Sequence, residues 1–217
     1  MRRYVRRYRR RRPRFARRQG RRRRVFRPRY RRGVASGTFR VKLTHVSTFT
    51  AKNDAVTHTW MSFEPKDFDE FSNLAPNFEA YKFTKCRVRV IPMQNVSNNS
   101  TSQVPMYCIL PWHTLAPQSN TFEKFMSVDK AKIFKQTQTG SMVFNVNTLS
   151  AVAYADGQAS LKTEWMPRIE IDANAYMVRH FAGLIAFQGD PSMADRSTKF
   201  TIVQDVWCTF YNQKTLK

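Results

Sequence analysis

The side chains best equipped for chemistry in this chain are arginines, and they crowd its first 32 residues. That segment holds nineteen arginines and no acidic residue. A guanidinium stays protonated at physiological pH, and its planar fork of N–H donors matches the oxygens of a phosphate group. So dense a block of like charge repels itself and has little apolar surface to bury, so it cannot fold alone. A polyanion can neutralise it, and the chemistry that it predicts is phosphate binding.

The first 33 residues are therefore a predicted disordered, nucleic-acid-binding arm. Such an arm gains free energy by releasing the counterions condensed on a nucleic acid, which is independent of base sequence. The aromatic residues interleaved with the arginines either stack on unpaired bases or simply reflect composition. The same basic run fits a nuclear localisation signal. The candidate phosphate-binding residues are Arg2, Arg3, Arg6, Arg7, Arg9, Arg10, Arg11, Arg12, Arg14, Arg17, Arg18, Arg21, Arg22, Arg23, Arg24, Arg27, Arg29, Arg31 and Arg32.

The remainder of the chain, 34–217, has the composition of one ordinary globular domain. The whole chain has 38 basic and 15 acidic residues. Without the nineteen arm arginines, 19 basic residues face 15 acidic ones, a net charge of about +4. No apolar run reaches the roughly 20 residues of a membrane-spanning helix, and no apolar segment follows the charged N-terminus as in a secretory signal. The three cysteines lack metal-site spacing and are expected to be buried thiols within strands.

Alternating and β-branched segments predict eight strands and little helix. Connections of alternately short and long length suit a single eight-stranded jelly roll, an all-β fold of two four-stranded antiparallel sheets. The short connections should then meet at one end of the domain and the long ones at the other. The strands are expected at about 39–45, 55–64, 81–91, 104–112, 131–137, 141–147, 180–188 and 200–211.

An arginine-rich arm before an eight-stranded domain resembles the capsid proteins of circoviruses and cycloviruses, the Circoviridae. The stretch NFEAYKFTKCRVRVIP (77–92) shows the pattern F-E-x-Y leading into a basic strand that ends in proline. The stretches RHFAGLIAFQG (179–189) and FTIVQDVWCTFYNQ (200–213) are similar to the last two strands of that family. The resemblance covers the whole chain in layout and about forty residues in detail. The short length and brief loops resemble the cyclovirus proteins more than those of circoviruses.

This resemblance implies a viral coat protein that self-assembles into a small T=1 icosahedral shell of about sixty copies. It further implies circular single-stranded DNA as the packaged genome. The implied locations are the virion and the host nucleus, where the arm would engage the host nuclear import machinery. A host cell-surface attachment factor is a further implied partner.

Basic side chains also occupy the polar faces of two predicted strands. Arg40 and Lys42 alternate with apolar residues in the first strand, and Lys85, Arg87 and Arg89 do so in the third. In a jelly roll these two strands share a sheet and are separated by the last strand, so their basic faces should point the same way. The five residues then form either a lumen-facing surface that contacts DNA or a merely solvated sheet face.

Patterns for catalysis or for a metal site are missing from the sequence. There is no G-x-x-x-x-G-K-[ST] phosphate loop and no G-x-S-x-G nucleophile elbow. The four histidines are too far apart for the paired-histidine metal motif of a rolling-circle nickase. The acidic residues of 67–70 alternate with Phe68 and precede Phe71, which is typical of a helical turn packed on the domain. We therefore expect no enzymatic activity, no metal and no cofactor.

The competing interpretation is a monomeric, non-viral nucleic-acid-binding or chromatin-type protein with a basic tail. A shell subunit must bury large surfaces against its own copies, so its long loops should carry apolar side chains that a monomer would avoid exposing. The long loops do carry such residues, which favours assembly. These residues are Phe122, Phe125, Met126, Trp165, Met166 and Tyr176.

Overall fold

The structure is a computed structural model, and it describes residues 37–52, 54–93, 104–115, 121–153, 159–193 and 197–214. The predicted arm and the polar loop 94–103 lie outside the described residues.

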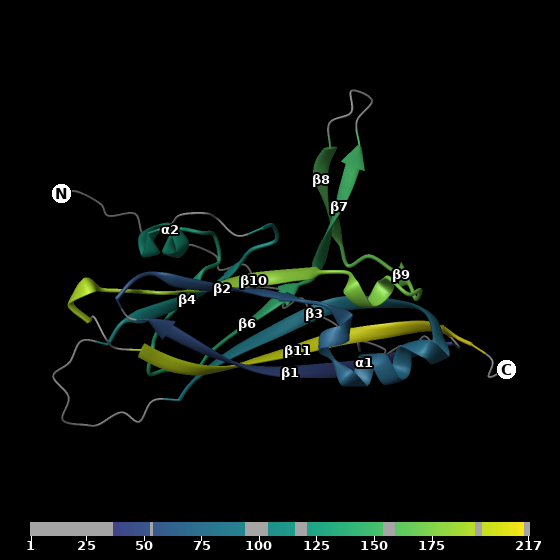
Figure 1. Cartoon of the computed structure of the whole chain (residues 1–217), viewed down its shortest axis with the longest axis horizontal. Helices are drawn as coiled ribbons and strands as arrows, with labels where there is room; N and C mark the ends of the chain where they lie inside the picture. Colours follow the sequence, from purple (N-terminus) through teal and green to yellow (C-terminus); the bar gives the residue numbers. More distant parts are fainter. Residues whose placement is uncertain are drawn as a thin grey trace, which may run out of the picture. The chain divides into compact units, whose positions relative to one another are not determined.

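Two antiparallel sheets make up the domain (Figure 1). The first sheet has the order β1-β11-β3-β6, with a short strand, β9, paired to β3. Its strands are β1 (Thr38–Lys52), β11 (Ser197–Gln213), β3 (Phe78–Pro92), β6 (Gly140–Asn145) and β9 (Ile169–Glu170). The second sheet has the order β5-β4-β10-β7-β8, with β2 paired to β10. Its strands are β5 (Lys132–Lys135), β4 (Met106–Pro111), β10 (His180–Phe187), β7 (Asn147–Ala153), β8 (Ala159–Trp165) and β2 (Thr57–Phe63).

The prediction of an all-β jelly roll is confirmed. Strands β1, β11, β3 and β6 form one four-stranded layer, and β2, β10, β4 and β5 form the other. The chain passes between the two layers as it does in a double-sheet jelly roll. The remaining strands, β7, β8 and β9, lie in the segment that was expected to be a long connection. β7 pairs with His180 and Phe181 of β10, and the hairpin that it forms with β8 projects away from the sheets (Figure 1).

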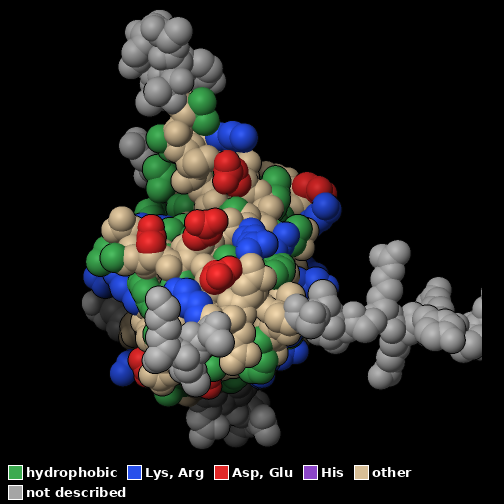
Figure 2. All heavy atoms as spheres, turned by 90° about the vertical axis from the view of Figure 1, so that its right-hand side faces the viewer, with side chains coloured by type: hydrophobic (Ala, Val, Ile, Leu, Met, Phe, Trp, Pro, Cys, Tyr) green, Lys and Arg blue, Asp and Glu red, His purple; other side chains and the backbone are tan. Residues whose placement is uncertain are grey.

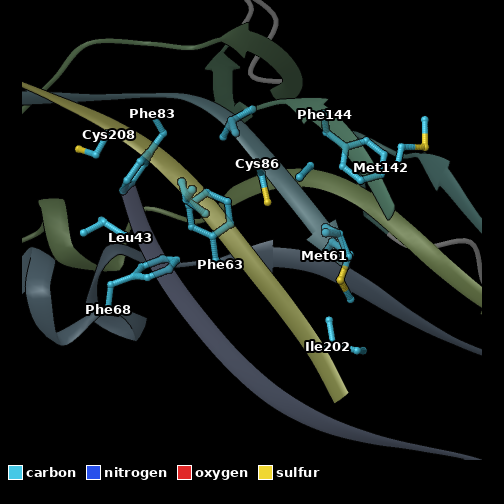
Figure 3. Close-up of a cluster of buried hydrophobic side chains, with 14 of the residues drawn as sticks. Leu43, Met61, Phe63, Phe68, Phe83, Cys86, Met142, Phe144, Ile202 and Cys208 are labelled. Carbon is cyan, nitrogen blue, oxygen red and sulfur yellow. The ribbon is translucent and has the colours of Figure 1, made fainter. Parts of the chain in front are cut away.

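The core lies between the sheets because each strand alternates apolar and polar side chains. In β3, Cys86, Val88 and Val90 are fully buried, whereas the residues between them face outward. Figure 3 shows side chains from β1, β2, β3, β6 and β11 in this space, with Phe63 and Cys86 near its middle. Burying a side chain of this size contributes roughly 1.5–3 kcal/mol. The same alternation that builds the core therefore fixes which residues remain on the outer face.

All three cysteines are free and buried in strands, as predicted. Burial raises the pKa of the Cys86 and Cys108 thiols to about 12, and it also raises the pKa of Cys208. A thiol with so high a pKa is not a thiolate at neutral pH, so these cysteines contribute packing and not reactivity.

In the part of the chain that the structure describes, helices are few and short. They are the α-helices α1 (Asp69–Leu74) and α2 (Phe122–Met126) and the 3₁₀ helices η1 (Pro65–Asp67), η2 (Ala75–Asn77), η3 (Ala175–Met177) and η4 (Pro191–Met193). None of the helices in the described ranges is long and apolar enough to cross a membrane. Around α1, Phe68 and Phe71 are buried while the neighbouring carboxylates are exposed, which confirms the predicted helical turn.

The loop residues that favoured assembly are mostly covered within the chain itself. Phe122 and Phe125 of α2 are 4% and 2% exposed, because they pack on Leu110 and Leu184 of the second sheet. Tyr176 packs against the main core. Of that set, Trp165 at the end of β8 remains half-exposed. The inference from exposed loop residues to assembly is therefore wrong for α2, whose apolar face is used inside the domain.

Where the described residues test it, the short connections meet at one end and α1 lies at the other, as expected, with one exception. At one end, the backbone N–H of Met93 donates to Lys199 O (3.0 Å) and that of Gln136 donates to Pro105 O (2.9 Å), so residues that border three of the short connections lie together. The turn between β1 and β2 lies at the same end, and α1 lies at the other (Figure 1). The exception is the connection after β4, because α2 returns over the outer face of the second sheet.

His180 is a core residue and not a metal ligand. Its ring is 1% exposed and lies between Phe63, which stacks on it at 5.4 Å, and the edge-on ring of Phe83 at 4.8 Å. Its Nδ1 donates to Val178 O (2.8 Å), and its Nε2 has no hydrogen-bond partner among the described residues. Burial lowers the pKa of His180 to about 4. Protonation would place an unsolvated cation between aromatic rings.

We predict that His180 makes the domain acid-sensitive. An unfolded histidine titrates near pH 6.5, so between about pH 6.5 and 4 the unfolded chain binds a proton that the folded chain refuses. The free energy of unfolding should then decrease as the pH is lowered, by up to about 1.4 kcal/mol per pH unit. The change His180→Phe should remove this slope in urea unfolding followed between pH 7 and 4.5, whereas the control His58→Phe should keep it. An unchanged slope in His180→Phe would contradict the assignment.

Candidate nucleic-acid interface

The five basic strand residues lie on one face of the first sheet, as the sequence predicted. β1 and β3 both pair with β11, which places Lys42 and Lys85 opposite Trp207 and places Arg87 opposite Asp205. The residues between them, such as Leu43 and Cys86, point into the core. We call this outer surface the basic sheet face; its members are Arg40, Lys42, Thr44, Lys85, Arg87, Arg89, Asp205 and Trp207.

A single buried carboxylate organises the basic sheet face. Asp205, on the central strand β11, has no exposed surface. Arg87 donates to its Oδ2 through Nη2 (2.6 Å) and Nε (3.1 Å), and Thr44 donates to its Oδ1 (2.9 Å). Lys42 Nζ lies 3.5 Å from Oδ1, and Arg89 Nη2 lies 3.2 Å from Oδ2. Three cations from two strands therefore share one anion on the strand between them.

The cations keep the Asp205 carboxyl ionised although it is buried. Burial on its own raises the pKa of Asp205, but the hydrogen bonds from Arg87 and Thr44 and the charges of Arg89 and Lys42 outweigh burial and lower it below its ordinary value. The three cationic side chains are themselves between about a third and a half exposed. Water therefore screens part of this attraction.

Positive charge remains in excess on this face after Asp205 is counted. Its three partners carry a total charge of +3 against one carboxylate, a surplus of +2. Arg40 and Lys85 are exposed, and neither forms an ion pair with a carboxylate in the described ranges. By contrast, Figure 2 shows acidic and basic side chains interspersed at the end of the domain that carries α1. The basic sheet face thus has the charge to bind a polyanion.

Trp207 is a feature of this face that the sequence analysis missed. It is partly exposed, and the Arg87 guanidinium carbon lies 5.8 Å from the centre of its ring. The alternation in β11 was a usable signal. Val206 and Cys208 point into the core, so their neighbours in the strand, Asp205 and Trp207, must point outward. What the alternation does not give is the cross-strand register that makes Lys42 and Lys85 their neighbours.

The remaining candidate residues are not brought into a site. All nineteen arm arginines lie outside the described residues, and their role stays a prediction. Within the described ranges, no group of three or more His, Cys, Asp or Glu side chains could hold a metal ion. His113 is engaged through Nδ1 with Asn147 Oδ1 (2.9 Å), next to the Trp165 ring.

Comparison with known proteins places this arrangement in a viral context. A family model for the circovirus capsid protein matches residues 2–214. The capsid protein of human associated cyclovirus 1 is 38% identical over 182 residues, which cover 82% of this chain and 83% of that protein. The crystal structure of a 60-mer of the BFDV capsid protein matches with a TM-score of 0.63 at 13% identity, over 83% of this chain and 96% of that one. A decameric form of the BFDV protein matches with a TM-score of 0.55 at 12% identity, over 80% and 99% respectively. At these identities the two structures show that the fold is shared.

Replacement of Asp205 tests the role of the buried carboxylate. The change Asp205→Asn removes the anion and leaves three neighbouring cations to repel one another, so we expect a loss of roughly 2 kcal/mol of folding free energy at pH 7. The pKa of Asp205 is lowered in the folded chain, so the wild type should be more stable than the variant above about pH 4. This difference in stability should shrink as the pH falls through the folded pKa of Asp205. Urea unfolding at pH 7 and pH 3 measures both effects.

The control for this test is Asp129→Asn, because Asp129 is 89% exposed and lies 4.0 Å from Lys130. It should change stability by less than about 0.5 kcal/mol. A wild-type stability for Asp205→Asn at pH 7, or a deficit that is the same at both pH values, would contradict the electrostatic role.

Proposed function

The chain belongs to the circovirus capsid protein family, and we propose that it assembles into a small T=1 shell that packages circular single-stranded DNA. A T=1 shell has about sixty copies, as does the BFDV assembly that shares its fold. As a capsid protein it has a structural role in the virion. Family membership decides against the non-viral, chromatin-type alternative.

The observation that carries the packaging proposal is that the arm closely precedes, in the sequence, a strand that bears part of the basic sheet face. β1 begins at Thr38 and bears Arg40 and Lys42 on that face. Arg32, the last arm arginine, precedes Arg40 by eight residues. Eight residues span at most about 28 Å even when fully extended. Because so short a stretch of chain joins the two sets of charge, we infer that both contact the packaged polyanion and that the basic sheet face lines the shell interior.

The arm's charge also matches a small genome. Nineteen arginines in each of about sixty copies supply on the order of 1,100 positive charges, and a single strand carries one phosphate per nucleotide. The shell should then hold roughly one to two thousand nucleotides, with the remaining charge offset by the basic sheet face and by small cations. The proposed arm, 1–33, further serves as the nuclear localisation signal read by host import machinery. The outer loops would meet the cell-surface attachment factor.

Deletion of residues 1–33 should separate folding from packaging. The arm has no apolar pattern, and the described strands begin at Thr38, so the truncated chain should keep its β-type circular dichroism and its urea midpoint. Its particles, viewed by electron microscopy, should be empty, with an absorbance ratio at 260 and 280 nm of protein alone. Loss of the β signal would contradict the division into arm and domain, and particles that retain as much nucleic acid as the wild type would contradict the packaging role of the arm.

Substitution of the arm arginines should show that charge, and not base sequence, sets binding. Replacement of all nineteen by lysine keeps the charge and loses only the fork geometry, so it should retain most binding, whereas replacement by glutamine should remove the arm's contribution and with it most of the binding. Filter binding of single-stranded oligonucleotides to the full chain should weaken steeply with salt, by a slope of about −0.7 per phosphate contacted. A flat salt response, or a strong preference for one base sequence, would show that charge neutralisation is not the mechanism.

A further inference from the structure

We propose that Trp207 is a stacking platform for an unpaired base, and that Lys42 and Lys85 hold the phosphates on either side of it. This inference rests on the proposed packaging of single-stranded DNA, and it adds a fixed contact within the folded domain to that of the arm. The occupant to which it commits is a single-stranded segment of nucleic acid.

The position of Trp207 is the first argument. It lies on β11, the strand between β1 and β3, and its cross-strand partners on both sides are lysines, Lys42 and Lys85. Neighbouring strands lie about 4.8 Å apart, so the two lysine Cα atoms stand about 10 Å apart with the indole between them. Each ammonium sits on a flexible four-carbon stem and reaches a phosphate as a point charge. A partly exposed aromatic ring between two cations combines the two elements of single-strand binding, a stacking surface and a basic groove.

A local irregularity in the sheet creates this arrangement. The pairing of β11 with β3 shifts between Trp207 and Cys208, where β3 contributes one additional residue, Thr84. The Thr84 hydroxyl donates to Trp207 O (3.3 Å) at this bulge. Bulges re-aim side chains and are over-represented next to functional sites. Here the bulge brings Lys85 opposite Trp207 while the residues beyond it, such as Phe83, still face the core.

The charge around the ring is the second argument. Arg87 approaches the indole at 5.8 Å and is also bound to Asp205, so its guanidinium is held in place before any ligand arrives. Lys85 is exposed and has no carboxylate partner within the described residues. An aromatic ring set in a field of excess positive charge is complementary to a nucleotide, which is anionic and has a flat face. It is poorly complementary to a second copy of the same basic surface.

Stacking on Trp207 selects for unpaired bases. In a duplex both faces of each base are covered by its neighbours, whereas a single strand can offer a base to the indole at little cost. Phosphate contacts by the arm do not make this distinction, because both forms carry them. The structure therefore assigns to the domain, and not to the arm, a preference for single over double strands of roughly tenfold per stacked base.

Photo-crosslinking of the full chain to a single-stranded oligonucleotide carrying 5-iododeoxyuridine tests the proposal. Trypsin cuts after Lys199 and Lys214, and the peptide 200–214 contains Trp207 as its single tryptophan. We expect crosslinks on this peptide in addition to the arm. The yield of these crosslinks on peptide 200–214 should persist in Trp207→Phe and should fall at least tenfold in Trp207→Leu. It should also fall in Lys85→Gln. A duplex of the same sequence should give a correspondingly lower yield.

Two controls separate this inference from the proposed function. Trp60→Leu removes a tryptophan that is 40% exposed on the second sheet, and it should leave the 200–214 crosslink unchanged. A competitor oligonucleotide with the same phosphates but without bases should reduce the crosslinks to arm peptides and leave the crosslink to peptide 200–214. If Trp207→Leu does not fold, the mapped crosslink in the wild type and in Trp207→Phe still decides the case.

Crosslinks confined to arm peptides, with total binding intact, would overturn the role of Trp207 and leave packaging by the arm standing. The same holds if the 200–214 crosslink is unaffected by Trp207→Leu. Failure of the full chain to retain any oligonucleotide would overturn the proposed function itself.

Discussion

One buried carboxylate, Asp205, stabilises the cations of the basic sheet face. Lys42, Arg87 and Arg89 reach the same carboxylate from β1 and β3, so three like charges that repel one another are gathered around it. Such repulsion between two strands would oppose their joint pairing with β11. Asp205, placed on β11 between them, accepts hydrogen bonds or ion pairs from all three. The basic sheet face thereby holds a surplus of positive charge that a polyanion can neutralise.

The strands of the jelly roll position the basic sheet face. The same strands that bury Leu43, Cys86 and Val206 against the second sheet carry cations on their opposite faces, so one period-2 pattern builds both the core and the basic sheet face. In the sequence, β1 begins six residues after Arg32, the last arginine of the arm. Folding and nucleic-acid binding therefore depend on the same alternation, and a one-residue slip of β1 against β11 would destroy both.

Much of this could be predicted from the sequence, for a physical reason. Alternation within a strand is a local property, so the eight strands, the buried cysteines and the common orientation of the five basic residues followed from it. Contacts between strands are not local. The sequence does not show that Asp205 meets three cations or that Trp207 lies between two lysines, because these depend on cross-strand register and on the bulge at Thr84. The apolar residues of α2 were misassigned to an exposed loop for the same reason, since their partners Leu110 and Leu184 are distant in sequence.

The central claim is that the basic sheet face and the arm together neutralise packaged single-stranded DNA inside the shell. Electron cryo-microscopy of DNA-filled particles assembled from the full chain tests it most directly. The account predicts that the outer face of the β1-β11-β3-β6 sheet lines the lumen, with nucleic-acid density over Asp205 and Trp207. A reconstruction in which this face lies on the exterior, or is sealed between subunits with no nucleic acid against it, would contradict the account.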